Sequence, residues 1–250
     1  MNLHNAARSG NLAEIKRVAS ELFSDGLTVN IKDINDEAPL HLACQNGDID
    51  MIRLLIDLGA DIDMRDGTNR TALHLVCKYG YTDCMAELIA LGADVMTRDQ
   101  VGTTPLHLAC EYGRAATAAE LIRTGADIGA RIGTDSTTYR LTFINNSEPS
   151  WGLSMHNCAG STPLHTASLC GRTDCVVELI DAGADLEAQD REKHTPLHLA
   201  CLCGNTDCVK ELIMRGACRT PTNISGNTPA DLITNPETLA LFTCMAKRAI

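Results

Sequence analysis

Short apolar segments recur in pairs along this chain, separated by turns rich in Gly and Asp. Within a pair, the first segment starts at Thr-Pro or a close variant and stops at Gly. Thr is favoured as a helix N-cap, and Pro is favoured at the first helical position because no backbone donor is needed there. The second segment carries an apolar stripe at helical spacing, as in Glu87-Leu88-Ile89, and stops at Gly-Ala-Asp. The pattern predicts pairs of short helices, with a left-handed Gly after each helix and an extended turn after each pair.

One heptapeptide marks the first helix of five of the pairs. Thr104 to Cys110 reads T-P-L-H-L-A-C, and residues 195–201 repeat it without change. Variants occupy residues 38–44, 71–77 and 162–168. His41, His74 and His107 are 33 residues apart, as are His165 and His198. A period of 33 residues built on T-P-L-H-x-A is typical of the ankyrin repeat, and the chain resembles the ankyrin-repeat family.

The resemblance implies an all-α repeat solenoid in which helix-turn-helix units carry β-hairpin fingers. We expect a single domain over residues 1–250 with about seven units, near 1–32, 33–65, 66–98, 99–131, 157–189, 190–222 and 223–250. The first unit is longer, because His4 and His41 are 37 residues apart. The four extra residues, within Ser20 to Leu27, should lengthen its second helix or the following loop. In the last unit, Ala230-Asp231 replaces Leu-His after Thr228-Pro229, and a final helix is expected from Glu237 to Arg248.

An insertion of 25 residues interrupts the period between His107 and His165, which are 58 residues apart. Alignment of Asp99 with Asn157 places it at 132–156, where a finger should form. Tyr139, Leu141 and Phe143 alternate with polar residues, which is typical of a strand with one apolar face. We expect an enlarged finger, in part a β-hairpin. Its aromatic residues, which include Trp151, would either pack on the array or anchor a partner.

The net charge of −11 and the absence of a dense Lys/Arg run argue against nucleic-acid binding and favour a basic protein partner. No apolar run reaches membrane-spanning length, and we expect no signal peptide, because the first repeat begins almost at residue 1. Most of the 12 cysteines share repeat positions, which predicts a ladder of buried thiols in a reducing compartment. We therefore expect a monomer in the cytoplasm or the nucleus.

The recurring histidines could be read as metal ligands or catalytic residues. One repeat separates each histidine from the next, however, so their side chains stack along the array and do not surround one metal ion. The resemblance implies that they hydrogen-bond within the turn and to the neighbouring unit. Cys201, Cys203 and Cys208 lack the C-x₂-C spacing of zinc sites. There is no phosphate-binding loop and no nucleophile–base pair. We expect a protein without enzymatic activity, cofactor or metal.

The positions that differ between units are the candidates for function. In the family, the two residues before the Gly of the first helix, together with the finger tips, face a concave binding surface. Exposed Tyr on such a surface indicates contact with a partner, although partial burial against a neighbouring finger would also explain it. The predicted partner-binding residues are Asn46, Lys78, Tyr79, Glu111, Tyr112, Leu169 and Leu202 on helices, Asn35, Asp36, Asn69, Arg70, Gln100, Arg191 and Lys193 on fingers, and Tyr139, Phe143 and Trp151 in the insertion.

These features predict a protein-interaction module: an adaptor, a scaffold or an inhibitor. Two alternatives stay open from the sequence. One is a substrate-recognition subunit of a ubiquitin-ligase or signalling complex. The other is a microbial effector directed at a host protein.

Overall fold

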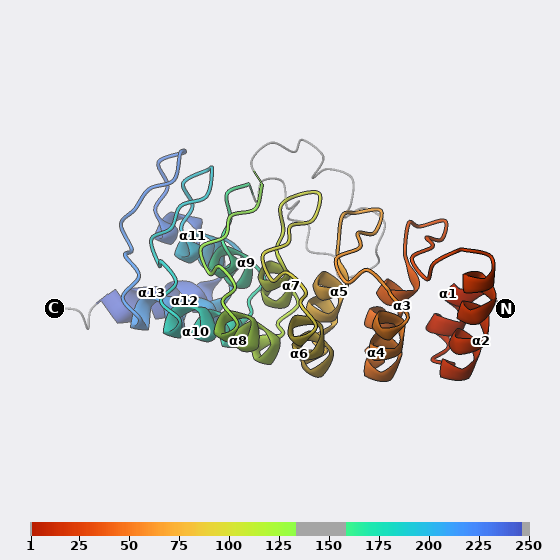
Figure 1. Cartoon of the computed structure of the whole chain (residues 1–250). Coiled ribbons are helices and arrows are strands. Elements are labelled where there is room, and N and C mark those ends of the chain that lie inside the picture. The colour runs from red at the N-terminus through yellow and green to blue at the C-terminus, as the bar shows by residue number, and fades with distance from the viewer. Residues whose placement is uncertain (1, 134–158, 247–250) are drawn as a thin grey trace.

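The computed structural model describes residues 2–133 and 159–246, and these residues form a helical repeat solenoid (Figure 1). This confirms the predicted fold class. The first helices of the pairs are α1 (Leu3–Arg8), α3 (Pro39–Asn46), α5 (Ala72–Tyr79), α7 (Pro105–Glu111), α9 (Pro163–Leu169) and α11 (Pro196–Leu202). The second helices are α2 (Leu12–Ser24), α4 (Ile49–Asp57), α6 (Thr82–Ala90), α8 (Ala115–Arg123), α10 (Thr173–Asp181) and α12 (Thr206–Met214). A 3₁₀ turn, η2 (Pro229–Leu232), and α13 (Pro236–Ala246) follow.

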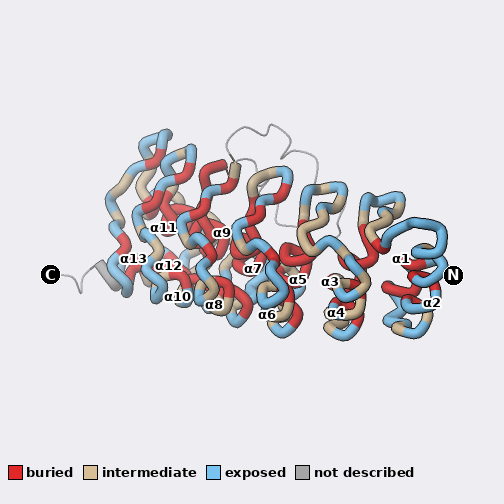
Figure 2. Tube along the Cα trace, viewed as in Figure 1, coloured by how far each residue is buried: buried red, intermediate tan, exposed pale blue. Residues whose placement is uncertain are grey.

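Each helix packs mainly on its own partner and on the equivalent helix of the next pair. Helix α5 contacts α3 and α7, and α8 contacts α6 and α10. The buried residues form one apolar core that runs the length of the array (Figure 2). Because every unit completes its core on its neighbours, the 33-residue period in the sequence is a period of packing.

The first helices begin as the Thr-Pro pattern predicts. Thr104 is the N-cap of α7, where its hydroxyl accepts a hydrogen bond from the backbone N–H of His107 at 3.5 Å. The Thr104 N–H donates to Nδ1 of His107 at 3.3 Å, so the other ring nitrogen, Nε2, donates to the Ser161 carbonyl at 3.2 Å. His107 is fully buried. It therefore joins the start of its own helix to the finger of the next unit.

The fingers project from one side of the array, between successive pairs (Figure 1). They are hairpin-shaped turns, and the described residues contain no β-strand. In one finger the Asp99 N–H donates to the Thr103 carbonyl at 3.0 Å. Asp99 Oδ1 accepts from the N–H groups of Val101 and Thr103 at 3.0 and 2.8 Å. Neighbouring fingers are joined by single backbone bonds, such as Gln100 N–H to the Thr68 carbonyl at 3.1 Å.

The ends of the array depart from the period much as the sequence predicts. Helix α2 has 13 residues where α4 has nine, so the four extra residues of the first unit lengthen its second helix. In the last unit the first helix is reduced to η2, where Asp231 takes the capping place of the histidine and accepts from the Thr228 N–H at 2.8 Å. Lys247 and Arg248, the predicted end of the last helix, lie outside the described residues.

The hydrogen bonds that flank the insertion show where the period is interrupted. His107 bonds a carbonyl 54 residues away, whereas His74 bonds one 29 residues away, a difference of 25. Ile132 N–H donates to the Ser161 carbonyl at 2.9 Å, as Asp99 does to Thr103, and Gly133 N–H donates to the Val101 carbonyl at 3.0 Å. Ile132 and Gly133 thus occupy regular finger positions. The predicted insertion at 132–156 therefore starts no earlier than residue 134. Residues 134–158, with the predicted hairpin of Tyr139, Leu141 and Phe143, lie outside the described residues.

Candidate protein-binding site

The C-terminal ends of α5 and α7 bring Lys78, Tyr79 and Tyr112 together. The Lys78 Nζ lies 5.4 Å from the ring centroid of Tyr79 and 5.3 Å from that of Tyr112. Both distances are within the range of a cation–π interaction. Each tyrosine is 36% exposed, so part of its ring contacts Lys78 and part faces solvent. We call these helix ends, together with the fingers beside them, the finger-side surface.

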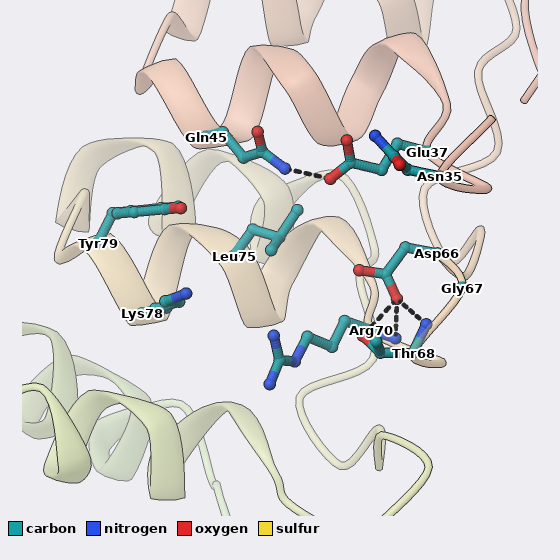
Figure 3. A pocket seen from close by; sticks show the side chains of 10 residues that line it. All are labelled: Asn35, Glu37, Gln45, Asp66, Gly67, Thr68, Arg70, Leu75, Lys78 and Tyr79. Carbon is teal, nitrogen blue, oxygen red and sulfur yellow. Dashed lines mark hydrogen bonds between the residues drawn. The ribbon is translucent and has the colours of Figure 1, made fainter. Parts of the chain in front are cut away.

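A pocket of about 270 Å³ opens on this surface between the second and third units (Figure 3). Figure 3 shows Glu37 and Gln45 on one wall, Arg70 and Lys78 on the other, and Leu75 between them. Gln45 donates a hydrogen bond from its side-chain amide to the carboxylate of Glu37. We call this the Lys78 pocket; its lining is Asn35, Glu37, Gln45, Asp66, Gly67, Thr68, Arg70, Leu75, Lys78 and Tyr79.

The finger behind Arg70 is held by Asp66. Its Oδ1 accepts hydrogen bonds from the backbone N–H groups of Thr68 at 2.7 Å and of Arg70 at 2.9 Å. The backbone of Arg70 is therefore fixed, and its side chain extends along the pocket wall (Figure 3). Nε of Arg70 is buried without a hydrogen-bond partner in the described part of the chain and lies 3.7 Å from Oδ2 of Asp99.

Burial shifts the ionisation of the groups around this site. It lowers the pKa of Lys78, with the positive charge of Arg70 as a further cause. It also raises the pKa of Glu111, against the opposing effect of Arg70 and Lys78. Burial, together with the charge of Glu111, raises the pKa of Tyr112 to about 12. The ends of α5 and α7 therefore hold charged groups that are partly withdrawn from water.

The predicted finger residues lie on the surface. The structure exposes Asn35, Asp36, Asn69, Gln100, Arg191 and Lys193. Asp36, Asn69 and Lys193 share one repeat position and have left-handed φ angles of 59°, 62° and 57°. Asp and Asn adopt this conformation more readily than other non-Gly residues, so the turn itself explains two of the three identities.

The other predicted residues differ in how far their side chains are exposed. Asn46 is exposed, but its side-chain amide donates to the Arg8 carbonyl at 2.9 Å and so also links the first two units. Leu169 and Leu202 are half-buried at the ends of α9 and α11. The remaining three, Tyr139, Phe143 and Trp151, lie outside the described residues.

The predicted partner-binding residues leave out six residues that line the Lys78 pocket: Glu37, Gln45, Asp66, Gly67, Thr68 and Leu75. Leu75 reads as a core position, and Asp66 reads as the start of a turn. A usable signal was nevertheless present, because Leu75 precedes Lys78 by three residues and so lies on the same helical face. The pairing of Glu37 with Gln45 had no signal within one unit, since it joins a finger to a helix.

Two chemical properties can be stated for the described ranges, 2–133 and 159–246. They contain no group of three or more His, Cys, Asp or Glu residues placed to hold a metal ion. No helix in them is both long and apolar enough to cross a membrane. The stacked histidines instead bond to finger carbonyls, as His165 Nε2 does to the carbonyl of His194 at 3.0 Å.

A family model described as "Ankyrin repeats (3 copies)" matches residues 2–66, 58–132 and 135–224. The chain belongs to the ankyrin-repeat family. Solved ankyrin-repeat domains have the same architecture across nearly the whole chain. That of Bcl-3, described as a unique member of the IkappaB protein family, is 26% identical with a TM-score of 0.75, and the match covers 97% of this chain and 98% of that one. That of human ASB11 is 25% identical with a TM-score of 0.76, and the match covers 97% of each chain.

Similarity to curated proteins is local. Protein phosphatase 1 regulatory subunit 27 of Mus musculus is 43% identical over 59 residues, and that of Homo sapiens is 44% identical over 59 residues. Each match covers 24% of this ankyrin-repeat chain and 36% of the relative, so it spans about a third of the length of these relatives. Ankyrin repeats generally mediate protein–protein interaction, and this is the function class that the family assigns to the chain.

Proposed function

We propose that this ankyrin-repeat protein is a non-enzymatic adaptor, scaffold or inhibitor that binds its partner on the finger-side surface. The observation that carries the proposal is the Tyr79–Lys78–Tyr112 cluster beside the Lys78 pocket. Tyr is enriched among the residues that dominate binding energy at protein interfaces, and it loses little side-chain entropy when it is held by a partner. Here the two rings are already held by contact with Lys78, so binding would cost little further ordering.

The partner's charge and the setting are part of the proposal. A chain with a net charge of −11 attracts a protein of opposite charge and repels acidic competitors. We therefore propose a partner that is basic as a whole. The stack of buried thiols, such as Cys44, Cys77 and Cys110, suits a reducing compartment, and we propose a monomer in the cytoplasm or the nucleus.

The test is affinity purification of partners from the source cell with the wild-type chain and with the double variant Tyr79→Ala/Tyr112→Ala. We expect the loss of both rings to weaken capture at least about 30-fold, since a single anchor at an interface contributes about 2 kcal/mol. Phe23→Ala is the matched control, because Phe23 is an exposed aromatic residue on the second-helix row. Equal capture by the wild type and the double variant would refute the assignment of the surface.

A role as a regulatory subunit in a signalling complex is the second candidate. The local likeness to a protein phosphatase 1 regulatory subunit favours it over a substrate-recognition subunit of a ubiquitin ligase or a microbial effector. Probing the same purification for a phosphatase catalytic subunit and for ligase core subunits distinguishes these roles. A phosphatase that is captured by the wild type and lost with the double variant would support the second candidate.

A further inference from the structure

Two repeat positions that are eight residues apart form the walls of the Lys78 pocket. One is the last finger residue and the other lies near the end of the first helix. In the second unit these positions hold Glu37 and Gln45, whose side chains hydrogen-bond to each other. In the third unit they hold Arg70 and Lys78, which are both cations and cannot pair. The pocket therefore has one wall with an internal hydrogen bond and one wall with two positive charges (Figure 3).

The two cations have incomplete partners in the described part of the chain. Lys78 makes no ion pair there, and its ammonium lies against the rings of Tyr79 and Tyr112. Arg70 has only the distant Asp99 carboxylate at 3.7 Å, and its Nε has no hydrogen bond. The Arg70 side chain is still 30% exposed and Lys78 is half-buried, so an added acceptor that reaches both cations would stabilise this wall.

The nearby carboxylates supply that acceptor only in part: Oδ2 of Asp99 pairs with Arg70 at 3.7 Å, and no carboxylate of the described residues pairs with Lys78. Glu37 is bonded to Gln45, and Oδ1 of Asp66 and of Asp99 accept the backbone N–H groups of their own fingers. Glu111 lies in α7, on the other side of Lys78, and among the described residues its carboxylate forms no hydrogen bond or ion pair with Lys78 or Arg70. The open side of the wall, above Leu75, is left for a group from outside the chain.

We propose that the Lys78 pocket binds the carboxylate of an Asp or Glu side chain of the partner protein. Arg70 and Lys78 would donate charge-assisted hydrogen bonds to its two oxygens, and Leu75 and Tyr79 would contact its methylene groups. The inference rests on the proposed function and deepens it. Because the whole chain carries a net charge of −11, the acid would be a local exception on a partner that is otherwise basic.

A random peptide library displayed on phage, selected against the full chain, provides the probe. Dissociation constants of the selected peptides are then measured for the wild type, Lys78→Gln, Arg70→Gln and the control Lys210→Gln, an exposed lysine in α12. We expect peptides with Asp or Glu at one fixed position. Lys78→Gln and Arg70→Gln should each weaken their binding about 10-fold, and Lys210→Gln should not change it.

A double-mutant cycle assigns the contact. When the peptide carboxylate is replaced by its amide, Asp→Asn or Glu→Gln, Lys78→Gln should cause little further loss, because the pair is already broken. Melting temperatures check that the variants fold. If Arg70→Gln destabilises the finger by removing the ion pair with Asp99, the binding data for Lys78→Gln alone decide the test.

Three outcomes overturn the inference. The carboxylate site is refuted if the selected peptides depend on Tyr79 but lack an acidic residue. It is also refuted if they bind Lys78→Gln as well as the wild type. Both results leave the proposed function intact. Peptides that require a phosphorylated residue when the selection is repeated after kinase treatment identify a phosphate site instead. If no selected peptide is sensitive to Tyr79→Ala/Tyr112→Ala, both the inference and the proposed function fail.

Discussion

Single residues at the ends of α5 and α7 show how a binding surface differs from the packing beneath it. Lys78 and Glu111 occupy the same position of successive units, and both are held partly out of water, which disfavours the charged form of each. A position with only a structural role would favour a residue whose polar group has a hydrogen-bond partner within the chain, as Gln45 of the preceding unit has in Glu37. Ionisable groups whose charged forms are disfavoured by burial are common at functional sites.

Glu111→Gln tests this effect of burial. The folded chain raises the pKa of Glu111, so the stability that its protonated form contributes is present below the unfolded-state pKa and is lost as the pH rises through the folded-state pKa. Glutamine resembles the protonated form. We expect Glu111→Gln to increase the free energy of unfolding at pH 7.5 and to change it little at pH 4, as measured by urea denaturation.

The control is Glu120→Gln. Hydrogen bonding to Arg123 lowers the pKa of Glu120, so its charged form is the favoured one in the folded chain. This substitution should not increase stability at pH 7.5. A loss of stability in Glu111→Gln at pH 7.5 would show instead that Lys78 and Arg70 outweigh the burial of Glu111.

At the scale of elements, α8, α10 and α12 are each joined to the preceding unit by a hydrogen bond from the side chain before their first residue. The N-cap residue of α8, Arg114, lies over Gly80 and donates from Nε to the Lys78 carbonyl at 3.2 Å. A Cβ on Gly80 would lie 2.6 Å from Cδ of Arg114. Gly80 is therefore required twice, for its left-handed conformation and for the close approach of Arg114 from the next unit.

Gly80→Ala and Gly59→Ala separate these two requirements. Both glycines have positive φ angles, +82° and +88°, but a Cβ on Gly59 would meet no atom within 4 Å. Gly59→Ala should cost about 1–2 kcal/mol from backbone strain alone. We expect Gly80→Ala to cost measurably more in urea denaturation, because Arg114 must also move. Equal losses would mean that the contact with Arg114 contributes nothing.

Much of the fold could be predicted from the sequence, because the same local signals recur in every unit. Thr104 and Pro105 start α7, Gly80 ends α5, and the extra residues near Ser20 lengthen α2. The site was harder to predict, for two physical reasons. The Lys78 pocket forms between two units, so no single repeat contains it, and Leu75 resembles any other core leucine. The charges of Arg70 and Lys78 are visible in the sequence. Their incomplete pairing is not, because it depends on where the finger places the Arg70 side chain.

At the scale of the whole molecule, the repeat register is complete across the described residues on the two sides of 134–158. The finger that Ile132 and Gly133 enter has the same backbone bonds as the finger of Asp99, with Ile132 N–H to the Ser161 carbonyl at 2.9 Å. Arg131 also donates to the carbonyls of Gly160 and Gln189, at 2.8 and 2.6 Å. These bonds join the two halves of the array directly.

Deletion of residues 134–158 should therefore leave a folded array. We expect the melting temperature, followed by circular dichroism, to stay within about 4 °C of the wild type, which corresponds to about 1 kcal/mol in a chain of this size. Deletion of residues 72–96, a segment of equal length that contains α5 and α6, should abolish cooperative unfolding. A large drop in melting temperature after the first deletion would show that the inserted residues are part of the core.

Hydrogen–deuterium exchange reports which face of the array the partner covers. Exchange would be compared in the free chain and in its complex with the captured partner. If the partner binds the finger-side surface, exchange should slow over residues 66–70, at the end of α5 and at the end of α7, with the second helices α4, α6 and α8 unchanged. Protection confined to those second helices, with none at Tyr79 and Tyr112, would contradict binding at that surface.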